Sequence, residues 1–200
     1  CTTSVHKIFG HDSLNYWVIK HYGNQYHIEK LDQNLNFVAT EPLRMYEGLR
    51  TYEPEYFVHF HDELYVFMTR RGFSDITLYY QKIDKNTLMP STGFIELTTI
   101  DFVRGNWADF HFSLSRNRNT LLVAARTKMN WSGVQFNEFY VFGPGLSLKW
   151  TTKDSYEFKG QGPRDNKYLV DDQGNVSILS LLKRESILSL FSDVRNLYTI

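Results

Sequence analysis

The sequence has one cysteine, little alanine and no long apolar run, and each shortage excludes a class of protein. A single cysteine permits neither an intrachain disulfide nor a cysteine-rich zinc site. No stretch approaches the ~20 apolar residues that a membrane-spanning helix needs. Lysine plus arginine (22) balances aspartate plus glutamate (22), so no net charge attracts nucleic acid or an anionic membrane. We therefore expect no nucleic-acid binding.

What the sequence does contain is aromatic residues, which make up 16% of the chain and include 13 tyrosines and 15 phenylalanines. Aromatic side chains favour the pleated surface of a sheet, whereas the scarce alanine is the strongest helix former. A chain of 200 residues hides roughly 70% of its unfolded surface, enough for a sizeable core. Composition predicts an all-β protein.

One phrase, a tyrosine strand followed by a turn, occurs three times. It reads YHIEKLDQNL at 26–35, YYQKIDKNTL at 79–88 and, in degenerate form, YVFGPGLSL at 140–148. An apolar strand that follows a polar turn precedes each copy. A fourth apolar strand starts at Asp171, and ESILSLFSD at 185–193 takes the place of its tyrosine strand. Residues 181–190 also fit a helical stripe, but their place in the repeat favours a strand.

An entry strand precedes each apolar strand, so every unit has four strands. The entry strands read SVHKIF, EYFVHF, ADFHFSL and NKYLV and recur at about fifty residues, the spacing of propeller blades. A lone four-stranded sheet leaves its faces and edges uncovered, and stacked copies cover the faces. We predict a β-propeller or propeller fragment of about four four-stranded antiparallel blades, at residues 4–54, 55–107, 108–165 and 166–200.

The second half of the chain resembles exported propeller-like proteins of the Bacteroidetes. The resemblance lies in an S-x5-LLV strand, a YVF-x2-3-L-x3-W strand and a VDxxGNV blade opening, at Ser115, Leu121, Leu122, Val123, Tyr140, Val141, Phe142, Leu146, Trp150, Val170, Asp171, Gly174, Asn175 and Val176. Gly143-Pro144-Gly145 replaces the aspartate usual after VF. The resemblance implies longer chains with more blades, so we expect a fragment, with a closed four-bladed ring as the alternative.

Cys1 and the polar TTS after it are typical of a bacterial lipoprotein after signal-peptide removal. The alternative is a truncation that starts at Cys1. Together with the resemblance to exported Bacteroidetes proteins, this N-terminal sequence predicts an exported protein of the periplasm, outer membrane or cell surface. A lipid on Cys1 would be the only membrane attachment.

Histidines near the entry strands are weak metal candidates. His59 and His61 stand two residues apart, so we expect them to share one face of a strand, and His111 has a comparable place in the next unit. Further ligands from other strands would be needed for a metal site. We favour packing roles for these histidines and predict no metal and no cofactor.

Carboxylates near the blade starts are the candidates for glycoside hydrolysis, which uses an acid and a base or nucleophile facing one pocket. They are Asp101, Asp109, Asp171 and Asp172, and nothing in the sequence distinguishes them from turn-forming aspartates. Sialidase boxes, WD pairs, Gly-x-Ser-x-Gly elbows, phosphate loops and calcium loops do not occur.

Aromatic and arginine residues in connecting segments, which we expect to be exposed, are the remaining signal, because such residues anchor interfaces and stack on sugars. The alternative is that these aromatics pack between the blades. The candidates are Trp107, Trp131, Tyr46, Tyr52, Arg50 and Arg104. We predict a non-catalytic binding or scaffold module of the bacterial cell envelope, such as a lipoprotein accessory subunit of an outer-membrane complex, whose partner is a protein or a glycan. The alternative is a glycan-active hydrolase or lyase with a site in a central pocket.

Overall fold

A computed structural model describes residues 4–23, 25–102, 107–127, 134–157, 165–182 and 194–199. The chain divides into two compact units, Cys1–Thr99 (unit 1) and Ile100–Ile200 (unit 2). In the described ranges every regular element is a β-strand except one short 3-10 turn, so the all-β prediction is confirmed.

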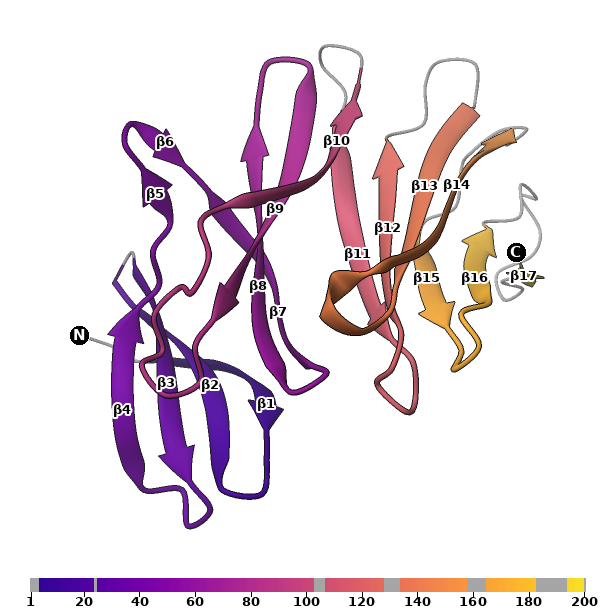
Figure 1. The fold of residues 1–200 in the computed structure, drawn as a ribbon. Coiled ribbons are helices and arrows are strands. Elements are labelled where there is room, and N and C mark those ends of the chain that lie inside the picture. Colours follow the sequence, from indigo (N-terminus) through magenta and orange to yellow (C-terminus); the bar gives the residue numbers. More distant parts are fainter. Residues whose placement is uncertain are drawn as a thin grey trace, which may run out of the picture. The chain divides into compact units, whose positions relative to one another are not determined.

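Unit 1 begins with a four-stranded antiparallel sheet in the order β1-β2-β3-β4 (Figure 1). Its strands follow chain order, β1 (Ser4–His11), β2 (Asn15–Tyr22), β3 (Gln25–Asp32) and β4 (Phe37–Pro42). A two-stranded hairpin comes next, β5 (Tyr46–Glu47) and β6 (Arg50–Thr51). Gly48 makes the hairpin turn with φ 60°, a conformation that glycine adopts without steric cost.

The second sheet of unit 1 has the order β10-β9-β8-β7. Its strands are β7 (Glu53–Phe60), β8 (Glu63–Arg71), β9 (Asp75–Ile83) and β10 (Ile95–Asp101), the last of which ends beyond the unit boundary. Phe60 pairs with Glu63, so His61 and Asp62 alone form the β7–β8 turn. Both have positive φ, as the two central residues of a type I′ hairpin require.

Unit 2 holds a four-stranded antiparallel sheet in the order β11-β12-β13-β14 and a three-stranded one in the order β15-β16-β17. The strands are β11 (Ala108–Leu114), β12 (Leu121–Thr127), β13 (Val134–Phe142), β14 (Leu148–Glu157), β15 (Asp165–Val170), β16 (Val176–Leu182) and β17 (Val194–Thr199). The predicted Gly-Pro-Gly turn is the 3-10 turn η1 (Pro144–Leu146), in which Gly145 has φ 63°.

The predicted four-stranded antiparallel sheet is therefore confirmed in three copies, and the fourth sheet has three strands among the described residues. The entry strands begin close to the predicted residues. One assignment is different. The strand beside β16 is β17, Val194–Thr199, and not the predicted ESILSLFSD segment at 185–193, which lies outside the described residues. Periodicity alone does not distinguish two apolar segments in succession. The number of blades and the closure of a ring stay predictions.

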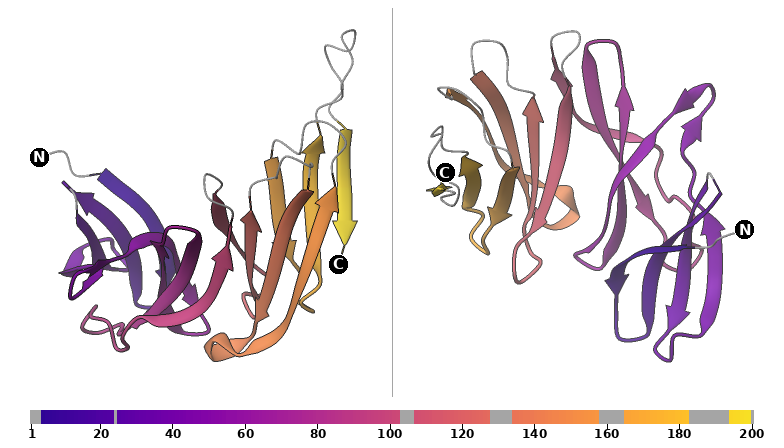
Figure 2. Two further views of the ribbon diagram at one scale, coloured as in Figure 1. Left: turned by 90° about the horizontal axis from the view of Figure 1, so that it is seen from above. Right: turned by 180° about the vertical axis from the view of Figure 1, so that it is seen from behind.

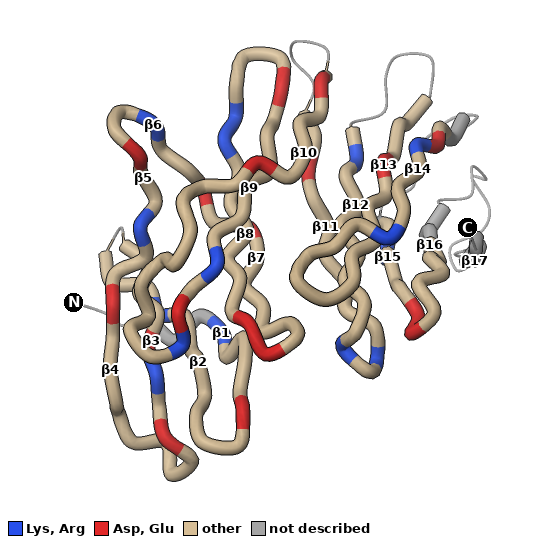
Figure 3. Tube along the Cα trace, in the orientation of Figure 1, with Lys and Arg blue, Asp and Glu red and all other residues tan. Residues whose placement is uncertain are grey.

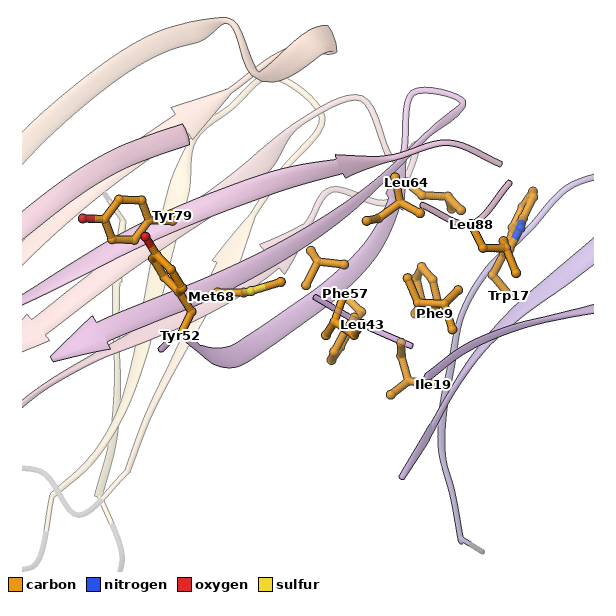
Figure 4. Packing of buried hydrophobic residues seen from close by; sticks show 13 residues of the cluster. Phe9, Trp17, Ile19, Leu43, Tyr52, Phe57, Leu64, Met68, Tyr79 and Leu88 are labelled. Carbon is orange, nitrogen blue, oxygen red and sulfur yellow. The ribbon is translucent and has the colours of Figure 1, made fainter. Parts of the chain in front are cut away.

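The core of unit 1 lies between its two sheets, and β1 contacts β7 there. Figure 4 shows Phe9, Trp17 and Ile19 of the first sheet facing Phe57 and Leu64 of the second. The rings of Phe9 and Phe57 lie 5.8 Å apart. This packing covers the apolar faces that a single sheet would expose, as predicted from the repeat.

The two sheets of unit 2 pack in the same manner, because β15 contacts both β11 and β12. Figure 1 and Figure 2 show both sheets, which can be followed by their pink-to-yellow colours. The buried residues are Leu122, Ala124, Phe139, Val141, Tyr168, Val170, Val176 and Ile178, with Trp150 at the side. Two hydrogen bonds tie the sheets together near the turns. Trp150 Nε1 donates to Gly174 O at 3.2 Å, and the backbone NH of Asn117 donates to Asp172 Oδ1 at 2.9 Å.

Candidate functional site

A polar row crosses the third sheet at one end of the apolar core of unit 2. Asp109 on β11 pairs in register with Arg126 on β12, which pairs with Asn137 on β13. Residues paired in this way project from the same face, and residues two positions along a strand share that face as well. His111 therefore lies on the face of Asp109, toward the side where Tyr168 packs.

Arg126 holds the Asp109 carboxylate with two hydrogen bonds. Nε donates to Oδ1 at 3.0 Å and Nη2 donates to Oδ2 at 2.6 Å, a bidentate geometry that fixes the carboxylate plane. The guanidinium also lies 5.2 Å from the ring centroid of Trp107. Asp109 and Trp107 each remain about a third exposed, so the site is open to solvent.

His111 completes the exposed part of the site. Its Nε2 lies 3.5 Å from Asp109 Oδ2, the distance of an ion pair rather than of a good hydrogen bond. The imidazole packs against Tyr168, with 5.0 Å between ring centroids. The carboxylate of Asp109 thus has a cationic or polar neighbour on two sides.

Beneath these residues lies a buried hydrogen-bonded network. Tyr168 Oη donates to Asn137 Oδ1 at 3.0 Å and accepts from Asn166 Nδ2 at 3.2 Å. Gln135, two residues from Asn137 on β13, is also buried. Its Oε1 has no hydrogen-bond donor among the described residues. The hydrogen bonds of this buried network hold the residues below the site in place, and Gln135 Oε1 is an acceptor that the network leaves unused.

The electrostatics keep Asp109 ionised. Burial by itself raises the pKa of the Asp109 carboxyl, but the contacts with His111 and Arg126 outweigh burial, so the pKa is lowered. Burial raises the pKa of Tyr168, which therefore stays a protonated donor at neutral pH. We name Asp109, Arg126, His111 and Trp107 the Asp109 cluster. It combines a fixed carboxylate, a guanidinium and an aromatic ring, groups that bind hydroxyl-rich ligands.

The histidines predicted as weak metal candidates have packing neighbours. His59 lies 5.2 Å from Trp17, and His61 lies 5.0 Å from Phe60 in the β7–β8 turn, centroid to centroid. Because His61 is a turn residue of positive φ, the pair does not share one face of a strand as predicted. In the described part of the chain, no group of three or more His, Cys, Asp or Glu residues could hold a metal ion.

The predicted binding residues separate into three groups. Trp107 belongs to the Asp109 cluster, whereas Tyr46 and Arg50 are exposed on the β5–β6 hairpin. Tyr52 is only 4% exposed, and its ring stacks on that of Phe94 with 3.8 Å between centroids. It also contacts Tyr79, with 5.1 Å between ring centroids (Figure 4). Its expected place on the surface is therefore wrong, because two aromatic neighbours take it into the core. Cys1, Arg104 and Trp131 lie outside the described residues.

Of the candidate carboxylates, only Asp109 joins the cluster. Asp171 accepts the backbone NH groups of Gln173 and Asn175 and so forms a turn, and Asp172 accepts from Asn117. Asp101 is exposed at the end of β10. Sequence reasoning missed Arg126 and Tyr168. An arginine opposite an aspartate in the paired strand is the signal that could have located Arg126.

Positive and negative residues are interspersed in both units (Figure 3), in agreement with the zero net charge. Across the described residues, no helix is both long and apolar enough to span a bilayer. No protein-family model matches the chain, and no curated protein matches it.

One solved structure is similar in fold, the endo-arabinase from Bacteroides thetaiotaomicron. The match has a TM-score of 0.50 and 11% identity over 99% of this chain and 74% of the endo-arabinase chain. At this identity the likeness concerns the fold alone. It supports a propeller-like fold for the repeated sheets.

Proposed function

We propose that this chain acts on a glycan, which it holds at the Asp109 cluster of unit 2. The observation that carries the proposal is the bidentate Arg126–Asp109 pair beside the part-exposed ring of Trp107. Sugar rings offer adjacent hydroxyls to charged groups and C–H faces to aromatic rings. A site with both groups held in place binds such a ligand at a small entropic cost.

Each residue of the cluster has a role in this proposal. The oxygen lone pairs of Asp109 that Arg126 does not use accept sugar hydroxyls. Trp107 offers its exposed surface for stacking, and His111 adds a donor or acceptor beside the carboxylate. Because its pKa is lowered, Asp109 is suited to a base, nucleophile or charge-stabilising role, and not to that of the acid.

The similarity in fold to a solved structure suggests which glycan to test first. The neighbour is named an endo-arabinase, so arabinan is the first polysaccharide that we would offer to this chain. We also propose a propeller in which the four sheets are blades, and an exported protein with a lipid on Cys1. Export would place the chain where polysaccharides occur.

A second candidate function is glycan binding without cleavage, and one observation favours it. The next carboxylate on the same cross-strand row is Asp154 on β14, three strands from Asp109. At ~4.8 Å per strand the two would lie roughly 14 Å apart, more than the ~5–9.5 Å between the carboxyl groups of glycosidases. Hydrolysis would thus need a carboxylate from beyond this row.

The experiment is a reducing-sugar assay and a binding assay on the same samples. The purified chain is incubated with arabinan, xylan, cellulose and pectin, and compared with the Asp109→Asn variant. We expect one polysaccharide to be cleaved or retained by the wild type and not by Asp109→Asn. Glu47→Gln, on the exposed β5–β6 hairpin, is the control and should behave like the wild type. Equal behaviour of wild type and Asp109→Asn on all four polysaccharides would overturn the proposal.

A further inference from the structure

Gln135 on β13 lies beside the Asp109 cluster, on the same face of the third sheet. Arg126 pairs with Asn137, and Gln135 is two residues from Asn137 along β13. Residues two apart on a strand share a face, so Gln135 is a diagonal neighbour of Arg126, at roughly 7–8 Å between Cα atoms. Both residues belong to unit 2.

The side-chain amide of Gln135 reaches the end of β12. Its Nε2 donates to Thr127 O at 3.3 Å. Thr127 pairs with Ala108, the residue between Trp107 and Asp109. The amide is therefore held at the end of the sheet where the aromatic ring and the carboxylate of the cluster lie.

The amide oxygen of Gln135 is an acceptor that the chain does not use. Gln135 is only 6% exposed, and none of the residues described in the structure donates a hydrogen bond to its Oε1. The contact with Thr127 O fixes the orientation of the amide, because two carbonyl oxygens cannot bond to each other. A buried acceptor without a donor costs free energy, so this exception in an otherwise bonded network requires an explanation.

We infer that Gln135 Oε1 accepts a hydroxyl group of the glycan, and so makes the site select a free hydroxyl at this place. The inference rests on the function proposed above. Asp109 and Trp107 are each about a third exposed, so the hydroxyl enters from their side. An acetylated or methylated hydroxyl has no proton to donate and would leave Oε1 unpaired. A site built to bond a hydroxyl rejects such an analogue strongly.

Gln81 on β9 is a matched control within the same chain. It is 1% exposed, and its Oε1 likewise has no donor among the described residues. Its neighbours on the same face of the strand are Tyr79 and Ile83, which belong to the apolar core of unit 1. Gln81 thus shares the unused acceptor but not the neighbouring charged cluster.

The test is a titration of the whole chain with arabinotetraose, xylotetraose and cellotetraose, followed by NMR at the side-chain carbonyl carbon of Gln135. We expect at least one oligosaccharide to bind and to shift this signal, because a hydrogen bond to Oε1 changes the shielding of Cδ. Gln135→Met removes the acceptor at similar volume and should weaken that binding at least tenfold. Gln81→Met should bind like the wild type. The melting temperature of ligand-free Gln135→Met should fall by less than about 2 °C, because the lost oxygen has no partner in the chain.

The outcomes separate this inference from the proposed function. If Asp109→Asn weakens binding and Gln135→Met does not, Gln135 is a structural residue and the inference alone is overturned. The opposite result would overturn the Asp109 cluster and support the acceptor. A bound oligosaccharide that leaves the Gln135 signal unmoved, as expected if a buried water already bonds Oε1, would also overturn the inference. So would a wild type that binds none of the three, whereas the polysaccharide assay decides the proposed function separately.

Discussion

Leu35 and Gly174 occupy the same position in two copies of one turn. In each copy an aspartate accepts the backbone NH groups two and four residues later, and the asparagine at the fourth place donates its side-chain amide back, in Asp32–Asn36 and in Asp171–Asn175. Both residues have positive φ, 63° for Leu35 and 96° for Gly174. One turn therefore has the residue suited to this backbone, and the other does not.

We expect Leu35→Gly to stabilise unit 1. A left-handed backbone costs a non-glycine residue about 1 kcal/mol, and Leu35 is mostly exposed, so little packing is lost. Leu35→Ala keeps the cost of the left-handed backbone and serves as the control.

Gly174→Ala should destabilise unit 2 by about 1 kcal/mol, although an added Cβ would meet only ordinary contacts there. Urea denaturation measures both, and a Leu35→Gly variant less stable than Leu35→Ala would contradict the account.

Removal of the Tyr168 hydroxyl should destabilise unit 2. In Tyr168→Phe, the buried Asn137 Oδ1 loses the hydroxyl that donates to it, and Asn166 Nδ2 loses one hydrogen bond. A buried polar atom that loses its hydrogen bond costs about 1–3 kcal/mol, so we expect a loss of about 2 kcal/mol in the free energy of unfolding. A loss below about 0.5 kcal/mol would show that other groups satisfy both asparagines.

Asp109 should make the stability of unit 2 dependent on acid. Its pKa lies below the ordinary 3.8, so its stabilising contribution is complete above the unfolded-state pKa and is lost as pH falls through the folded-state value. We expect the free energy of unfolding to decrease below about pH 4. The decrease should be smaller in Asp109→Asn because the variant lacks the contribution of Asp109. A decrease should remain, because both proteins keep the turn aspartates Asp32 and Asp171, whose pKa values are also lowered by asparagine hydrogen bonds. Parallel pH profiles for the two proteins would contradict this assignment.

Tyr46 and Tyr52 should behave in opposite ways when truncated. Tyr52→Ala removes a buried ring that stacks on Phe94, and we expect a loss of about 3 kcal/mol. Tyr46 is 61% exposed, so Tyr46→Ala should change stability by less than about 0.5 kcal/mol. Thermal unfolding of the two variants measures the difference. Similar melting temperatures would argue against the burial of Tyr52.

The repeated sheet could be predicted from the sequence because alternation and turn chemistry act locally. A strand such as Leu121–Thr127 is apolar along its length and lies between turn-forming residues, so its type and limits follow from short segments. The same local pattern predicted that neighbouring sheets cover each other's faces, and each unit contains one such pair of sheets.

The site could be predicted only in part. Trp107 and Asp109 were candidates by residue type, but their contact with Arg126 depends on the β11–β12 register, which places Asp109 opposite Arg126. Register is a property of paired strands, and a shift by one residue would turn Arg126 to the other face. Tyr52 was expected at the surface and lies in the core for a similar reason, because its stacking partner Phe94 is distant along the chain.

Calorimetric titration of the polysaccharide selected in the binding assay tests the central claim most directly. The wild type and Glu47→Gln should bind it with equal affinity, and Asp109→Asn should bind at least tenfold more weakly, a difference of about 1.4 kcal/mol. If Asp109→Asn binds as tightly as the wild type, the Asp109 cluster is not the glycan site of this chain.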